Sequence, residues 1–219
     1  MQATNTIPIV MLASGDPVAD GRIVSLARPG GNVTGVTNMS PQLSGKRLEL
    51  LKEVVPGASR VAVLGPLTNL TWQSQFRSAA QQLGVHLQWL QVQEADQIVN
   101  AFEAAMNGRS NALIVVPSAI TNSYAQRIVN LTAKHRLPTM YGVNRYVLNG
   151  GLMSYGPSIA ALHHRGASYV DRILKGAKPA DLPVEQPTKF ELFINLKAAK
   201  QIDLTIPPNV LARADSVIK

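Results

Sequence analysis

Several polar residues follow short apolar runs that read as buried strands, in turns that lead into helix-like segments. Hydroxyl and amide groups can hydrogen-bond a small polar solute, and a carboxylate can pair with an ammonium group. Asp16 could play that second role, and Arg145 could pair with an anion. The residues that we single out as candidate ligand contacts are Ser14, Asp16, Asn38, Thr68, Asn69, Ser118 and Asn144.

The same residue types also have a purely structural use. Ser, Thr, Asp and Asn accept hydrogen bonds from the free main-chain N–H groups at helix N-termini and in turns. Capping alone could therefore explain Ser14, Asp16, Asn38, Thr68, Ser118 and Asn144. The sequence leaves both interpretations open for each of them.

Motifs of catalysis are missing from the chain. It contains no Gly-x-Ser-x-Gly, no His-Glu-x-x-His and no Gly-x-x-x-x-Gly-Lys. His163 and His164 are adjacent on an expected helix, about 100° apart, so they cannot share one face as a pair of metal ligands. Cysteine is absent, which excludes disulfides, thiolate metal sites and cysteine nucleophiles. We therefore expect no enzyme, no metal and no cofactor.

The chain is basic, with 21 Lys and Arg against 13 Asp and Glu and a formal net charge of +8. These cations are scattered, and the densest groups are Lys46-Arg47 and Lys197 with Lys200. No run of five basic residues occurs, and no basic stretch is interleaved with aromatic residues. The pattern predicts a solvated basic surface, including Lys46 and Arg47, and no nucleic-acid partner.

Stepping along the 219 residues, short apolar runs alternate with longer amphipathic stretches, which predicts βαβ units and a mainly parallel sheet. Strands are expected over 7–13, 33–37, 61–65, 85–92, 112–116, 138–142, 152–155 and 190–194. Helices are expected over 18–28, after a Ser40-Pro41 cap, over 72–83, 98–106, 121–131, 158–175 and 196–201, and from Pro207-Pro208. Ligands of open parallel sheets bind at the carboxyl ends of the strands, where the candidate residues lie.

Six segments of the chain are similar to one protein family, in order and at matching spacing. They are ASGDPV (13–18), SLARPGGNVTG (25–35), KRLELLK (46–52), GGLMSYG (150–156), ASYVDRILKGAKP (167–179) and PTKFEL (187–192). Together they resemble the ABC-transporter substrate-binding proteins of the tryptophan/tyrosine type, over essentially the whole chain.

The resemblance implies an α/β fold of the type I periplasmic-binding-protein class, with two Rossmann-like parallel-sheet lobes and no covalent chemistry. It assigns residues 1–38 and 157–184 to the first lobe and residues 39–156 and 185–219 to the second. It implies that a small solute, such as an amino acid, binds in a cleft between the lobes, and that membrane permease subunits are partners in the periplasm. It adds Tyr155 to the ligand contacts and supports the seven residues above.

The family also begins with a signal peptide and further strand–helix units that have no counterpart here. We therefore expect an incomplete first lobe, as in a truncated gene product, a sequence with a mis-called start codon or a fragment, with an exposed apolar sheet edge. The alternative functions are a ligand-sensing domain of a transcriptional regulator and a truncated gene product without function.

Overall fold

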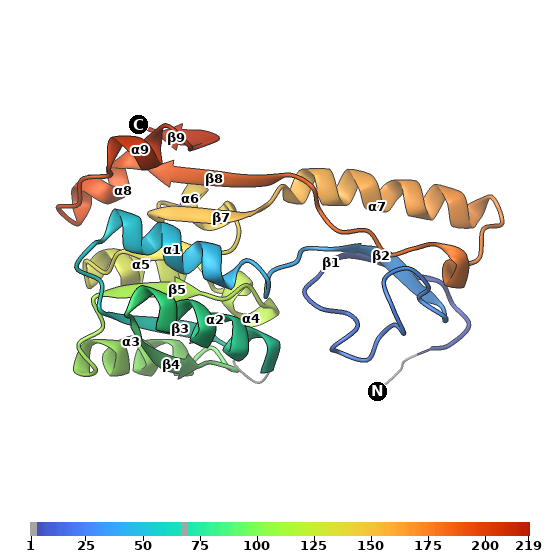
Figure 1. Ribbon diagram of the computed structural model, residues 1–219, viewed down its shortest axis with the longest axis horizontal. Helices are drawn as coiled ribbons and strands as arrows, with labels where there is room; N and C mark the ends of the chain where they lie inside the picture. The colour runs from blue at the N-terminus through green and yellow to red at the C-terminus, as the bar shows by residue number, and fades with distance from the viewer. Residues whose placement is uncertain (1–3, 67–69) are drawn as a thin grey trace. The chain divides into compact units, whose positions relative to one another are not determined.

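The computed structural model describes residues 4–66 and 70–219 of the chain (Figure 1). Contacts between residues separate the protein into two compact units. Unit 1 comprises the residues up to Pro41 together with Pro157–Phe190, and unit 2 comprises Gln42–Gly156 together with Glu191–Lys219. The chain therefore passes from one unit to the other three times, and each unit is built from segments that are distant in the sequence.

Unit 1 contains a two-stranded parallel sheet and one long helix. Its elements are β1 (Ile9–Ser14), β2 (Val33–Thr37), α7 (Ile159–Leu174) and the short 3-10 helix η1 (Pro179–Asp181). Val36 of β2 packs against Leu162 and Tyr169 of α7. Gly166 brings α7 close to β1, because a Cβ at this position would lie 2.1 Å from Cδ2 of Leu12. The expected strand 33–37 and helix 158–175 are thus confirmed.

Strand β1 leaves apolar side chains in contact with solvent. It has β2 as its only strand partner within the described ranges, and Ile9 and Leu12 are each 39% exposed. On α7, Val170 and Leu174 are exposed as well. The expectation of an apolar sheet edge agrees with this surface, which is of the kind that promotes association between chains.

The helix expected over 18–28 is wrong. One helical turn forms after Asp16, with the Asp20 amide donating to the Asp16 carbonyl at 3.0 Å. Gly21 then adopts φ +68°, a left-handed conformation that ends a helix. The apolar spacing of Ile23, Val24 and Leu26 suggested a helix, but in this irregular segment Ile23 is buried and Val24 is 78% exposed.

Unit 2 is organised around a seven-stranded sheet in the order β4-β3-β5-β6-β7-β8-β9. The strands are β3 (Arg60–Gly65), β4 (His86–Gln91), β5 (Ala112–Val115), β6 (Thr139–Tyr141), β7 (Met153–Pro157), β8 (Phe190–Asn195) and β9 (Ser216–Ile218). The β4–β3–β5–β6–β7 run and the β8–β9 pair are parallel. The prediction of an α/β fold with a mainly parallel sheet is therefore confirmed, whereas β9 was not predicted.

Helices cover both faces of this sheet (Figure 1). They are α1 (Ser44–Val54), α2 (Leu70–Leu83), α3 (Gln97–Asn107), α4 (Ala119–Ser123), α5 (Ala125–Lys134), α6 (Arg145–Leu148), α8 (Leu196–Gln201) and α9 (Pro208–Leu211). Alternate residues of β3 face opposite sides, so Val61 and Val63 join the core under α1 and α2. Ala62 and Leu64 join the core under α3 and α5.

Two expected helix starts differ from the structure. Ser40 and Pro41 lie in a turn, in which the Ser40 amide donates to the Asn38 side chain, and α1 begins only at Ser44. The helix expected from Thr121 to Leu131 is divided at Tyr124 into α4 and α5. No helix in the described part of the chain is long and apolar enough to cross a membrane.

Candidate functional site

The carboxyl ends of β1 and β2 carry two buried hydroxyl groups. Ser14 ends β1 and is paired with Thr37, which ends β2. Val36 faces α7, so Thr37, the next residue, faces the opposite side of the strand. Neither Ser14 Oγ nor Thr37 Oγ1 has a hydrogen-bond partner among the described residues, although both atoms are buried. Such groups are rare in proteins, because burying a polar atom without a partner is unfavourable.

Asp16 and Asn38 lie beside this pair and have structural partners. The Asp16 carboxylate accepts a hydrogen bond from the Ala19 amide at 3.0 Å, in the turn that follows β1. The Asn38 amide donates to the Ala13 carbonyl at 2.9 Å, and its oxygen accepts from Ser40 at 2.9 Å. Unit 1 thus brings Ser14, Asp16 and Asn38 together, and the capping interpretation describes the observed contacts of the last two.

In unit 2, the loops that follow β5 and β6 and the end of β7 are packed closely together. A Cβ on Gly142 would lie 2.1 Å from the Pro117 ring, and a Cβ on Gly156 would lie 2.2 Å from the Gly142 carbonyl oxygen. Both positions therefore require glycine, because any side chain would push the loops apart. This packing brings Ser118, Asn144 and Tyr155 to one edge of the sheet.

These three residues differ in how much of their hydrogen-bonding capacity the protein uses. Ser118 caps α4 in a reciprocal arrangement with Thr121, whose amide donates to Ser118 Oγ at 3.1 Å. Asn144 precedes α6 without capping it and is half-buried, and the Tyr155 side chain is half-buried in β7. Thr68 and Asn69, the other two predicted contacts, lie outside the described residues.

Two stacked tyrosines hold α6, and hence Asn144, in place. The rings of Tyr141 and Tyr146 are nearly parallel, with centroids 4.5 Å apart. The Tyr146 hydroxyl lies 3.3 Å from the side-chain oxygen of Asn122, which links α6 to α4. Burial raises the pKa of Tyr146 to about 12, so this phenol stays neutral and remains a hydrogen-bond donor.

The prediction that Arg47 is a solvated cation is wrong, because in the structure Arg47 lies buried in α1. Its side chain is completely buried, and its Nε donates to the Tyr155 carbonyl at 2.8 Å. Its Nη2 donates to the Gly142 carbonyl at 3.3 Å. Burial lowers the pKa of Arg47 to about 9, so the group is still cationic at neutral pH. Lys46 beside it is partly exposed, as predicted, and pairs with Glu49 at 2.9 Å.

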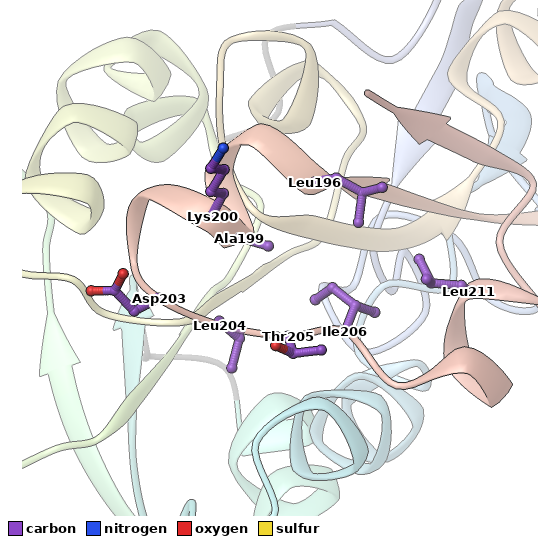
Figure 2. A pocket seen from close by; sticks show the side chains of 8 residues that line it. All are labelled: Leu196, Ala199, Lys200, Asp203, Leu204, Thr205, Ile206 and Leu211. Carbon is purple, nitrogen blue, oxygen red and sulfur yellow. The ribbon is translucent and has the colours of Figure 1, made fainter.

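One pocket of unit 2 lies away from these residues (Figure 2). It measures about 540 Å³ and is formed by α8, the segment after it and Leu211 at the end of α9. In Figure 2, Lys200 and Asp203 lie at one end, and Leu196, Ile206 and Leu211 lie at the other. Asp203 pairs with Arg136 at 2.7 Å, and Arg136 precedes the amino end of β6. None of the predicted contacts within the described residues lines this pocket.

The structure adds two residues to the predicted set. Thr37 was missed because it belongs to the strand rather than to the loop that follows, and its signal was its place directly before Asn38. Arg47 was missed because its sequence neighbours suggested a charged surface. Within residues 4–66 and 70–219 no group of three or more His, Asp or Glu side chains could hold a metal ion.

Comparison with known proteins shows which family this chain is similar to. The sequence profile of the ABC transporter substrate binding protein family matches residues 1–218. A tyrosine-binding protein of Clostridioides difficile is 26% identical over 206 residues, which are 92% of this chain and 59% of that protein. The chain therefore spans less than two thirds of the length of that curated relative.

Solved structures agree with this comparison. An ABC domain from Streptococcus pneumoniae in complex with L-Trp superimposes with a TM-score of 0.89 at 28% identity, over 99% of this chain and 73% of that one. A conserved domain protein from Vibrio cholerae gives 0.91 at 29% identity, over 98% of this chain and 73% of that one. The expected type I periplasmic-binding-protein fold is confirmed, and this chain belongs to the ABC transporter substrate-binding protein family.

Proposed function

We propose that this chain binds a small solute, an amino acid, as the substrate-binding component of an ABC uptake system, and that it carries out no covalent chemistry. Membership of the family supports this assignment. The observation that carries it is the pair of buried hydroxyl groups, Ser14 Oγ and Thr37 Oγ1, at the carboxyl ends of adjacent parallel strands. A polar ligand at this edge would satisfy both groups.

The chemistry of the unit 1 edge suits the ammonium end of an amino acid. Asp16 supplies a negative charge, and its carboxylate has a second oxygen besides the one that accepts from Ala19. The hydroxyls of Ser14 and Thr37 can accept or donate hydrogen bonds nearby. The names of the relatives, a tyrosine-binding protein and an L-Trp complex, direct the choice of ligand to aromatic amino acids.

Unit 2 supplies the other part of the proposed set of ligand contacts. Asn144 has an amide that does not cap α6, and Tyr155 has a half-buried ring at the end of the sheet. The complete proposal comprises Ser14, Asp16, Asn38, Thr68, Asn69, Ser118, Asn144 and Tyr155, with Thr37 added from the structure. We further propose that units 1 and 2 correspond to the two lobes, that the protein works in the periplasm and that membrane permease subunits are its partners.

The test is calorimetric titration of the 219-residue chain with L-tryptophan and L-tyrosine, with D-ribose as the control solute. Saturable binding of either amino acid, and none of the sugar, is the expected result. The absence of binding by a chain that melts cooperatively would contradict the proposal.

Asp16→Asn separates the two interpretations of Asp16. Asparagine keeps an oxygen that can accept from the Ala19 amide, but it removes the negative charge. We expect the free energy of unfolding to change by less than about 0.5 kcal/mol. Affinity for the amino acid should fall at least about tenfold, which corresponds to ~1.4 kcal/mol. Unchanged affinity would show that Asp16 is only a turn residue.

A further inference from the structure

The guanidinium group of Arg47 connects two main-chain segments that are distant in the sequence. Nε and Nη2 donate to the carbonyl oxygens of Tyr155 and Gly142, at 2.8 and 3.3 Å. Arg47 lies on the first helix of unit 2. Tyr155 is the penultimate residue of the first segment of unit 2, which ends at Gly156 before the chain enters unit 1 at Pro157. The side chain is completely buried, so these bonds are made away from solvent.

The surrounding main chain is shaped to admit this side chain. A Cβ on Gly142 would lie 3.3 Å from Cζ of Arg47, and a Cβ on Gly156 would lie 3.5 Å from its Nη2. The planar guanidinium presents donors in fixed directions, whereas an ammonium group is a single point with a different reach. A buried cation is also expensive to leave without its acceptors, so the two segments are held where the arginine needs them.

Both segments lead directly to proposed ligand contacts. Gly142 is two residues before Asn144, and the other acceptor is Tyr155 itself. The neighbouring strands β6 and β7 are aligned at Tyr141 and Ser154, so the two acceptors lie at the same edge of the sheet. Displacement of the guanidinium would therefore release both contacts together.

We propose that Arg47 is a positioning residue for ligand binding: it fixes the turn that carries Asn144 and the main chain of Tyr155, without touching the ligand itself. This inference rests on the proposed function, because it assigns Arg47 a role through two of the proposed contacts. It also makes a local claim about main-chain order that does not require a ligand.

The first experiment measures main-chain order in the ligand-free protein. Hydrogen–deuterium exchange is compared between the wild type, Arg47→Lys and the neighbouring control Lys46→Met, whose side chain is partly exposed. In Arg47→Lys we expect at least tenfold faster exchange in peptides that cover 142–146 and 155–156, with β3 and β5 unchanged. Unchanged exchange in those two peptides, or an equal increase across unit 2, would overturn the proposal. Arg47→Gln, which keeps a donor, replaces Arg47→Lys if the lysine variant does not melt cooperatively.

The second experiment is a double-mutant cycle on affinity for L-tryptophan. Arg47→Lys should lower the affinity at least tenfold in the wild-type background and by a clearly smaller factor in an Asn144→Ala background, because the part of its effect that acts through Asn144 is lost while the part that acts through Tyr155 remains. Equal effects in both backgrounds would overturn the positioning role. If the wild type binds neither L-tryptophan nor L-tyrosine, the proposed function fails, and the exchange experiment still decides the local claim about Arg47.

Discussion

Ser14 and Thr37 face each other across the parallel pair β1–β2, and the hydroxyl groups of both residues are buried without a hydrogen-bond partner in the part of the chain that the structure describes. A buried hydroxyl without a partner destabilises the folded state by about 1–3 kcal/mol. In a family of substrate-binding proteins, a cost of this kind at the carboxyl edge of a sheet is explained if ligand binding offsets it.

Replacement of Thr37 by valine should therefore separate stability from binding. Thr37→Val removes the unpartnered hydroxyl and keeps the shape of the side chain, so we expect the free energy of unfolding to stay constant or to rise by up to about 1 kcal/mol. Affinity for L-tryptophan should fall at the same time. Urea denaturation without ligand and calorimetric titration measure the two effects.

Thr34→Val is the matched control on the same strand. Thr34 is also buried, but its hydroxyl donates to the Leu182 carbonyl at 2.6 Å. This substitution leaves a buried carbonyl without its donor and should cost about 1–3 kcal/mol of stability. An equal loss in Thr37→Val would show that the Thr37 hydroxyl has a structural partner after all.

The close packing of the loops after β5 and β6 predicts a strong effect of one methyl group. Gly142→Ala would place a Cβ 2.1 Å from the Pro117 ring, so the loops must separate, and we expect a loss of about 1–3 kcal/mol in unfolding free energy. Gly57→Ala is the control, because a Cβ there meets no atom within 4 Å and should change stability by less than ~1 kcal/mol. Thermal or urea denaturation measures both, and similar values for the two variants would contradict the packing described here.

The exposed apolar residues of unit 1 predict self-association of the 219-residue chain. Ile9→Lys places a charge on β1, which pairs only with β2 in the described part of the chain, and charges on such an edge strand oppose pairing with another chain. Sedimentation velocity at increasing protein concentration should show larger species for the wild type than for Ile9→Lys. Leu148→Lys removes an equally apolar and more exposed side chain from unit 2, and it should leave the association unchanged.

The ion pair between Arg165 and Glu185 predicts a small loss of stability in acid. Arg165 donates to both carboxylate oxygens of Glu185, at 2.6 and 2.5 Å, and these hydrogen bonds lower the pKa of Glu185. A carboxyl group with a lowered pKa in the folded state stabilises the protein above its unfolded pKa and loses this effect as the pH falls through its folded pKa.

We therefore expect the unfolding free energy of Glu185→Gln to decrease less than that of the wild type between pH 6 and about pH 3. Both partners are substantially exposed, so the difference should stay under about 1 kcal/mol. Glu94→Gln, which alters an exposed carboxylate in unit 2, should behave like the wild type. Denaturation curves across this pH range supply the measurement, and parallel curves for Glu185→Gln and the wild type would refute the role of the pair.

The regular elements could be predicted because hydrophobic periodicity reflects burial directly. The stripe along 158–175 became α7, and the uninterrupted apolar run at 112–116 became β5 between two layers of helices. The prediction for 18–28 was wrong because its apolar spacing is typical of a helix, whereas the positive φ of Gly21 ends the helical turn that begins there. A single residue with positive φ carries little weight in a pattern that is averaged over many positions.

The candidate site was predictable in position but not in detail. Residue types and strand ends led to Ser14, Asp16 and Asn144. The sequence could not show which of their polar groups would form hydrogen bonds within the protein and which would be left without a partner there. Arg47 illustrates the same limit, because a buried cation depends on acceptors more than ninety residues away in the sequence. Contacts at that distance are set by tertiary packing and leave no local pattern.

The threefold passage of the chain between its units has a consequence for synthesis. The sheet of unit 2 is completed by β8 and β9, which leave the ribosome after β3 to β7 and after α7. Until β8 arrives, the edge of β7 remains open while the intervening α7 is translated. Pairings of such long sequence separation form slowly, and an open edge favours misassembly in the meantime. The nascent chain should therefore benefit from protection by chaperones until β8 and β9 are available.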